Sequence, residues 1–566
     1  MLTRLSAAAL HRPGLTALVI GAASATGFAP LGLWPVTLIA LALLLWLLEN
    51  AKTHRAAFGL GWLFGLGHFT VGNNWIATAF TFQAKMPAWI GMVAVPLLSL
   101  YLAIFIGLAT WAAWAAWQKL IPNLFPGEGR GPSPTAATST DRELSARLRG
   151  NARLPLTLLF SATWIVTEWL RSWVFTGFAW NPLSTMFLRD FQGPLLIRWI
   201  GTYGSSGLYI LYIGLLRWFW LYLKFDHPSA RQRGGLARFF IWLLIGGFVS
   251  SPLGWIDRLS STEPMYGERN RSITLVQPNI DQGDKWDMEQ RAVNFRKLAL
   301  LSPRSENQPP RLLLWPEAAV PDYLEGGYPL DWYVEAPGFT RAKLAGLLGP
   351  DDVMLTGAVK LDPLPDRSNI SGARNSVFSL DARGTLGPRY DKSHLVPYGE
   401  YLPARSILSL IGIERLAPGA IDFRHGPGPR SLDLGRFGKV GVQICYEIIF
   451  SGQVVDRADR PDFIFNPSND AWFGSWGPPQ HLAQARLRAI EEGLPVIRST
   501  PTGISAVIDA DGRVLDSIPI HTAGRIDSVV PPAHAPTLFA RYGNILPLAF
   551  AVFLVGLAIA FARRRR

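Results

Sequence analysis

The chain has 566 residues, of which 49% are hydrophobic and only 17% are charged, and its formal net charge is +13. A chain of this length is too long for one ordinary hydrophobic core, so two or more domains are expected. The apolar composition argues against an ordinary soluble protein and for membrane spans. A single cysteine excludes an internal disulfide framework. Much of the positive charge lies between apolar segments and in a terminal run, which favours membrane orientation over nucleic-acid binding.

Long apolar segments recur through the first 256 residues and return once near the end. A helix needs about 20 such residues to cross the hydrocarbon core of a bilayer. The boundary between the first two segments is open, because GFAPLGLWP is compatible with a tight turn or a kink. The sequence predicts about eight spans, at 15–31, 33–49, 57–80, 88–117, 154–175, 206–223, 239–256 and 545–562.

Basic residues divide the loops into rich and poor ones. The loops at 118–153 and 224–238 are rich in Lys and Arg and the chain ends in FARRRR, whereas 176–205 has only two such residues. Because Lys and Arg are retained on the cytoplasmic side, we expect both termini in the cytoplasm and the region after the seventh span outside it. The start, MLTRLSAAALHR, resembles a signal peptide, but the spans that follow at once favour an uncleaved first span.

Two features of the spanning region stand out. The stretch 126–141, rich in Gly, Pro, Ser and Thr, is typical of a flexible cytoplasmic loop. Glu168 and Arg171, in TEWLRSW, lie in or at the end of the fifth span, with a spacing that allows them to pair on one helix face. Ionisable residues at membrane depth are functional candidates; a structural pair near the interface is the alternative.

The long polar region after the seventh span has a different pattern. Short apolar runs rich in β-branched residues, such as SITLVQ, RLLLW and VMLTGAV, alternate with helical stretches at 287–301 and 480–493. Strands that alternate with helices predict a layered α/β domain. The predicted organisation is a seven-span domain at 1–257, an extracytoplasmic α/β domain at 258–540, and a last transmembrane helix with a basic tail at 541–566.

Reactive residues follow several of these strands. RLLLW leads into Glu317, SVFSLD leads through a turn to Lys392 and Glu400, and KVGVQI ends in Cys445, the only cysteine. In α/β folds reacting groups gather at the carboxyl ends of strands. Residues far apart in the sequence are therefore expected to share one pocket.

A thiol needs a base to take its proton or a cation to stabilise the thiolate. Glu317 is suited to be a buried base whose pKa is raised by desolvation, with His394 and His481 as other possible bases. Lys392 would favour the thiolate and stabilise an oxyanion. Each residue alone has a plainer reading: a lone cysteine is usually a small buried hydrophobe, and an isolated lysine or glutamate is usually a solvated charge. Together they predict an acyl-transfer site.

The segments LLLWPEAAVP, YDKSHLVPYGEYLP, GVQICYE and NPSNDAWFGSWGPPQHLAQARLRAIEEGLPVIRSTPTGISAVID together resemble the carbon–nitrogen hydrolase (nitrilase) superfamily, and most closely its membrane-bound family, the apolipoprotein N-acyltransferases. The resemblance covers about 270–530, and the eight-span arrangement agrees with it. It implies a four-layer αββα sandwich. Glu317 then matches the general base, Lys392 the transition-state stabiliser and Cys445 the nucleophile.

The resemblance assigns supporting roles as well. Glu400 matches a second glutamate that supports the lysine, and Tyr446 and Glu447 match residues that shape the pocket around the nucleophile. The implied reaction takes a fatty acyl chain from a phospholipid, through a cysteine thioester, to the α-amino group of the lipid-modified N-terminal cysteine of an apolipoprotein. No cofactor or metal is implied. The expected location is the bacterial inner membrane, as a multi-pass monomer with its catalytic domain on the periplasmic side.

Alternatives follow from the same residues. A membrane-tethered amidase or nitrilase would share the thioester but pass the acyl group to water. A transporter or receptor with an outer ligand-binding domain would not need the thiol at all. Three aromatic residues have two readings, either a membrane-dipping lip or ordinary packing: Trp472, Phe473 and Trp476.

Overall fold

The computed structural model describes residues 10–82, 87–124, 139–188, 196–225, 271–304, 308–408, 410 and 421–563. Most of the expected loop at 126–141, the expected span at 239–256, the first nine residues and the end of the terminal arginine run lie outside the described residues. The chain divides into two compact units. We call them the helical unit, with the described residues of Met1–Asn73, Val95–Ser260 and Tyr542–Arg566, and the sandwich unit, with those of Asn74–Ala94 and Ser261–Arg541.

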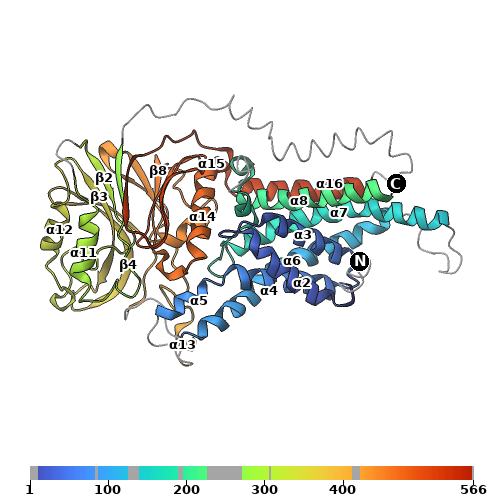
Figure 1. Cartoon of the computed structure of the whole chain (residues 1–566), viewed down its shortest axis with the longest axis horizontal. Helices are drawn as coiled ribbons and strands as arrows, with labels where there is room; N and C mark the ends of the chain where they lie inside the picture. The colour runs from blue at the N-terminus through green and yellow to red at the C-terminus, as the bar shows by residue number, and fades with distance from the viewer. Residues whose placement is uncertain are drawn as a thin grey trace. The chain divides into compact units, whose positions relative to one another are not determined.

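The helical unit is a bundle of long apolar helices (Figure 1). Proline in the first turn of α2 and α3 suits the helix start, where the missing N–H is not needed. Small residues let α2 and α4 approach closely: a Cβ on Gly67 would lie 2.2 Å from the Leu18 carbonyl oxygen. The helices are α2 (Pro13–Ser24), α3 (Trp34–Glu49), α4 (His54–Gly72), α6 (Ile90–Leu124), α7 (Ser139–Arg171), α8 (Ile197–Phe225) and α16 (Ile545–Arg563), with the 3₁₀ turns η1 (Ala25–Gly27) and η3 (Leu183–Phe187).

The described helices test the expected spans only in part. Two of them, Ile90–Leu120 and Ile545–Arg563, are long and apolar enough to cross a membrane, so the count of eight is not confirmed. The segment at 28–33 between η1 and α3 is a turn, and it separates the first two expected apolar segments. The expected span at 57–80 ends early, because α4 stops at Gly72 and residues 74–94, including α5 (Ile76–Ala79) and η2 (Phe80–Phe82), group with the sandwich unit.

The sandwich unit contains two six-stranded sheets, with strand orders β12-β1-β2-β3-β4-β5 and β11-β10-β9-β8-β7-β6. In the first sheet β1, β2 and β3 are parallel, while β4 is antiparallel to both β3 and β5. In the second sheet β7, β8 and β9 are parallel. The strands are β1 (Ser272–Gln277), β2 (Arg311–Leu314), β3 (Val353–Pro363), β4 (Ile370–Asp381), β5 (Leu386–Asp391), β6 (Ser431–Asp433), β7 (Lys439–Val442), β8 (Phe463–Pro467), β9 (Val496–Ser499), β10 (Ser505–Ile508), β11 (Val514–Ile518) and β12 (Gly524–Val529).

Alternation along the strands builds the layers. On β2, Leu312 and Leu314 face the core between the sheets, whereas Leu313 faces the helices α11 and α12, as the two-residue period of a strand requires. Figure 1 shows α11 and α12 beside the first sheet and α14 beside the second. The nitrilase-like αββα order is therefore present. The helices and 3₁₀ turns of this unit are α11 (Arg291–Leu300), α12 (Pro337–Ala345), α13 (Arg405–Leu408), α14 (Gly477–Glu492), η5 (Leu330–Trp332), η7 (Gly435–Phe437), η8 (Cys445–Ile449) and η9 (Asp470–Phe473), and α15 (Leu538–Tyr542) precedes α16.

Candidate active site

The polar residues that follow four strands meet at one edge of the sandwich. Glu317 follows β2 and Lys392 follows β5, which runs in the same direction as β2 because two antiparallel pairings separate β5 from β3. Cys445 follows β7 and Asn469 follows β8, its parallel neighbour. The first sheet thus supplies the carboxylate and the ammonium, and the second sheet supplies the thiol.

Glu317, Lys392 and Glu400 form one buried cluster, together with Asn375 of β4. Lys392 Nζ lies 3.0 Å from Glu400 Oε1 and 3.4 Å from Glu317 Oε1. The Asn375 amide donates to the same two oxygens, at 2.9 and 2.7 Å. Glu400 Oε2 accepts from the Val396 N–H at 2.9 Å. Every one of these charged groups is buried and compensated, which is the condition for keeping charge inside a protein.

A glycine makes room for Glu317. Gly357 lies on β3, and a Cβ there would sit 2.3 Å from the Ala318 nitrogen and 2.8 Å from the Glu317 Cα. The backbone bond from Gly357 N–H to the Pro316 carbonyl, at 3.3 Å, holds the two segments together. Close backbone approach therefore fixes where the carboxylate stands.

Cys445 is buried and starts η8 with a backbone φ of 52°, a conformation that non-glycine residues rarely adopt. Its thiol acts as a hydrogen-bond donor toward the Glu317 carboxylate, and the Asn469 N–H donates to its sulfur. Glu317 Oε2 makes no well-formed hydrogen bond within the described part of the chain. Behind the nucleophile, His481 Nε2 lies 3.1 Å from the Cys445 carbonyl oxygen. The strained turn presents the sulfur to the acid of the opposite sheet.

Glu447 connects the thiol turn to the lysine loop. Its Oε2 accepts from the Ile444 N–H at 2.7 Å, next to Cys445. Its Oε1 accepts from the N–H and hydroxyl of Ser393, both at 2.7 Å, next to Lys392. Tyr446 is buried, and its ring lies 5.2 Å from that of Phe450 and 5.8 Å from that of His394. Glu400 and Glu447 are thus buried members of the site, not solvated carboxylates.

The pKa directions follow from this packing. Burial raises the pKa of Glu317, but Lys392, Lys285 and hydrogen bonds from Asn375 and Cys445 outweigh it, so that pKa lies below 4.5. The expectation of a raised pKa was wrong, because two lysines flank the carboxylate. Burial and the neighbouring Glu317 charge hold the Cys445 pKa well above 9.0, although Lys392 opposes them.

Lys392 has the opposite shift. Burial alone would lower its pKa, but Glu400, Glu317, Cys445 and Glu447 raise it above 10.5. Lys392 is therefore a permanent cation at neutral pH. It lies beside a thiol whose pKa is raised and a carboxylate whose pKa is lowered.

Two residues at the site, Lys285 and Asn375, were not predicted, and His481 was predicted only as a possible base. Lys285 reaches it from the loop after β1, where its Nζ donates to the Glu317 carbonyl oxygen at 2.9 Å. Asn375 lies in the middle of β4, a position that the strand pattern alone does not distinguish. His481, named only as a possible base, contacts a backbone oxygen and Asp470 Oδ1, at 2.8 Å, within a buried group with Arg498. For Lys285, the available signal in the sequence was the polar stretch PNIDQGDKWD, which directly follows an apolar strand.

The aromatic residues after β8 pack within the sandwich unit. The Phe473 ring lies 4.6 Å from Trp75, and the Trp472 ring lies 5.8 Å from Phe82. Trp476 is the N-cap residue of α14 and is partly buried. For Trp472 and Phe473 these contacts favour ordinary packing over an exposed lip.

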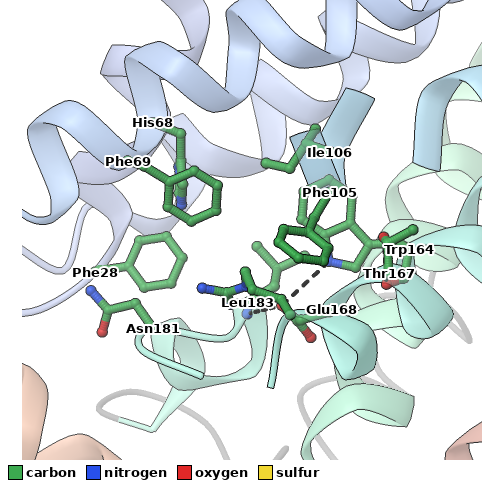
Figure 2. Close-up of a pocket in the computed structure, with 11 residues that line it drawn as sticks. Phe28, His68, Phe69, Phe105, Ile106, Trp164, Thr167, Glu168, Asn181 and Leu183 are labelled. Atoms are coloured by element: carbon green, nitrogen blue, oxygen red, sulfur yellow. Dashed lines mark hydrogen bonds between the residues drawn. The ribbon is translucent and has the colours of Figure 1, made fainter. Parts of the chain in front are cut away.

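The expected polar pair of the helical unit lines a small cavity of about 20 Å³, room for about one water molecule (Figure 2). Glu168 Oε1 accepts from the Leu183 N–H at 3.0 Å and from Trp164 Nε1 at 3.4 Å. Arg171 donates to the Trp180 carbonyl oxygen at 2.8 Å and stands over the Phe69 ring. These bonds hold the start of η3 and the residues just before it against α7, which favours the structural reading of Glu168 and Arg171.

Comparisons with known proteins fit both units. Residues 20–216 match the family model described as the apolipoprotein N-acyltransferase N-terminal domain, and residues 272–526 match the model described as carbon–nitrogen hydrolase. Among solved structures, a nitrilase-superfamily amidase from Nesterenkonia AN1 covers 49% of this chain and 95% of its own, with a TM-score of 0.33 and 16% identity. At that score the match adds nothing to the family models.

Curated relatives match along almost the whole chain. The apolipoprotein N-acyltransferase of Rhodopseudomonas palustris is 32% identical over 97% of this chain and 95% of its own. That of Bradyrhizobium diazoefficiens is 33% identical over 98% and 95%. Identity at this level over nearly full length, with both family models in their expected places, shows that the chain is an enzyme and belongs to the apolipoprotein N-acyltransferase family.

Proposed function

We propose that the protein transfers a fatty acyl chain from a phospholipid, through a thioester on Cys445, to the α-amino group of the N-terminal diacylglyceryl-cysteine of apolipoproteins. The observation that supports this most directly is the meeting of the chain's single thiol with an ionised carboxylate and a permanent ammonium. Family membership supports the two lipid substrates and does not favour the amidase or the transporter.

In the first half-reaction Glu317 takes the thiol proton as the sulfur attacks the ester carbonyl of the phospholipid. The ionised Glu317 carboxylate, toward which the thiol donates, is suited to receive that proton. Lys392 stabilises the negative oxygen of the tetrahedral intermediate. The carbon–oxygen bond to glycerol then breaks, and the leaving oxygen takes the proton from Glu317, so that a lysophospholipid departs and the acyl chain stays on sulfur.

In the second half-reaction the α-amino group attacks the thioester carbonyl and gives a proton to Glu317. The carbon–sulfur bond breaks, the sulfur regains that proton, and an amide leaves. A supporting role for Glu400 follows from its contact with Lys392, and one for Tyr446 and Glu447 from their places beside the nucleophile. Water is the competing acceptor, so an apolar surrounding of Cys445 protects the thioester.

The membrane arrangement is part of the proposal. We propose about eight spans with both ends in the cytoplasm, the sandwich unit on the periplasmic side of the bacterial inner membrane, and a monomer. The two apolar helices long enough to cross and the loop charges support it. Both substrates carry acyl chains, each CH₂ of which contributes about 0.8 kcal/mol to membrane retention. An enzyme held at the bilayer meets such substrates where they are.

The test is to incubate the full chain in proteoliposomes with acyl-labelled phospholipid and to look for label on the chain that hydroxylamine removes. Addition of a lipopeptide with an N-terminal diacylglyceryl-cysteine should then move the label from the chain into an amide. Cys445→Ala should accumulate none, because no other cysteine is present.

Two outcomes would overturn the proposal. Label on the Cys445→Ala chain equal to that on the wild type would rule out the thioester. Release of the label only as free fatty acid, with none in the lipopeptide at saturating concentration, would instead identify a hydrolase.

A further inference from the structure

Lys285 lies at the site without a role in the reaction described above. It stands in the loop between β1 and α11, and its Nζ donates to the Glu317 carbonyl oxygen at 2.9 Å. In the alternative orientation of the Asn469 amide, Nζ also donates to the Asn469 side-chain oxygen at 3.2 Å. One ammonium therefore connects the residue after β2 with the residue after β8.

Through these two contacts Lys285 is linked to both reacting groups, the Glu317 carboxylate and the Cys445 thiol. Glu317 carries the carboxylate that faces the thiol, and Asn469 supplies the backbone N–H that points to the Cys445 sulfur. Lys285 also interacts electrostatically with Glu317 and with Cys445. A cation in this position influences the charge state of both the base and the nucleophile.

The charge count of the cluster calls for such a cation. Glu317 and Glu400 are two buried carboxylates, and Lys392 is a single ammonium between them. An unbalanced buried charge is costly. Lys285 adds a second positive charge beside these two carboxylates, while the buried Glu447 carboxylate nearby is held by hydrogen bonds from Ile444, Ser393 and Tyr390. Moving the thiol proton to Glu317 only shifts the negative charge from oxygen to sulfur, close to both lysines.

We propose, on the basis of the function proposed above, that Lys285 is a positioning residue that keeps Glu317 and Asn469 in place and supplies the second positive charge for thiolate formation. It acts through these two residues, whereas Lys392 is the cation assigned to the oxyanion. Lys285 then joins the residues that follow β2 in the first sheet to those that follow β8 in the second.

The pKa of Lys285 gives this role a signature. Burial lowers it to about 8, although Glu317 and Cys445 oppose the shift. The second charge is therefore present at pH 7 and lost above about pH 9. Among the described residues, the other charged or titratable groups around the thiol and Lys285 include Glu317, Lys392, Glu400, Glu447, and the group of Asp470, His481 and Arg498.

The experiment is alkylation of the full chain by iodoacetamide in detergent between pH 6 and 10, followed by intact mass. Because the chain has one cysteine, every adduct reports Cys445. Lys285→Gln keeps a hydrogen-bond donor and removes the charge, so we expect about tenfold slower alkylation at pH 7. The two profiles should converge above about pH 9, where the wild-type lysine has lost its own proton.

Lys285→Arg and Lys297→Gln complete the set. Arginine stays charged, so its profile should lack the wild-type inflection near pH 8. Lys297→Gln, on α11, should follow the wild type. If Lys285→Gln does not fold, the comparison of the wild-type and Lys285→Arg pH profiles still tests the inference. Equal rates for wild type and Lys285→Gln at pH 7, or an inflection near pH 8 that survives in Lys285→Arg, would overturn the inference.

This assay is independent of acyl transfer. If the phospholipid experiment fails while the alkylation profiles differ as expected, the inference about Lys285 stands and the proposed substrates are wrong. If label reaches the lipopeptide but the profiles coincide, the proposed function stands and Lys285 is only a packing residue.

Discussion

Two buried groups of charged residues, one in each unit, differ in what their hydrogen bonds reach. In the sandwich unit Glu317, Lys392 and Glu400 bond to one another and face a thiol. In the helical unit Glu168 and Arg171 each bond to a backbone group of one neighbouring segment, and Glu168 also accepts from the Trp164 side chain. Buried charge that meets other charge near a nucleophile is arranged for reaction, whereas buried charge that caps backbone groups holds an element in place. The predictions below test that contrast.

The largest effect is expected for Glu317→Gln. Glutamine keeps the acceptor for Asn375 but cannot take the thiol proton, so the rate of acyl-enzyme formation should fall about 10²–10⁴-fold. Single-turnover label transfer measures the rate, and thermal unfolding in detergent measures stability. A rate within a few fold of wild type would mean that another group serves as base.

Gly357→Ala should act on the same carboxylate by displacement. The added methyl would overlap the Ala318 nitrogen and the Glu317 Cα, which are backbone atoms with little freedom to yield. A shift of about 1 Å at a reacting group costs about 10²-fold, so we expect a loss of that order in acyl-enzyme formation. Gly556→Ala, where a Cβ meets nothing within 4 Å, is the matched control. Equal rates in both variants would contradict the steric account.

The pH dependence of acyl-enzyme formation should show where the base titrates. The Glu317 pKa is lowered, so the ionised base is present above that pKa and is lost only as the pH falls through it, below 4.5. We therefore expect less than about a twofold change between pH 5.5 and 7. A half-maximal point near pH 6 would point instead to an imidazole as the base.

The smallest effect on rate is expected for Arg171→Met. It removes the bond to the Trp180 carbonyl, so stability should fall by about 1–3 kcal/mol, seen as a lower thermal midpoint in detergent. Acyl-enzyme formation per folded molecule should stay within about twofold. Lys119→Met, at an exposed position of α6, should change neither. A tenfold rate loss in Arg171→Met at unchanged stability would erase the contrast between the two groups.

The sequence predicted the site best where reactive residues follow strands. Glu317, Lys392 and Cys445 each come directly or soon after an apolar run, and parallel strands bring such ends to one edge. Asn375 was not predicted because it lies inside a strand, where a polar residue normally signals only an outward position. Lys285 was not predicted because its contacts come from a loop, whose path a periodic pattern does not encode.

The same limit explains the two errors. The direction of the Glu317 pKa depends on two lysines, one before and one after it in the chain, and burial alone gave the opposite sign. The third apolar segment was read as continuous to residue 80, but α4 ends at Gly72 and the next residues find aromatic partners in the sandwich unit. Hydropathy records how apolar a segment is, and not which neighbours it packs against.

The Glu447 carboxylate has a consequence for how the enzyme would fail. One of its oxygens accepts from the turn that carries Cys445, and the other accepts from the loop that carries Lys392. Displacing either segment alone would therefore break hydrogen bonds to Glu447. We therefore expect activity to be lost cooperatively, and not gradually, as temperature or detergent concentration rises. Molecules would pass in one cooperative step from fully competent to inert, leaving no population with a displaced but still reactive sulfur.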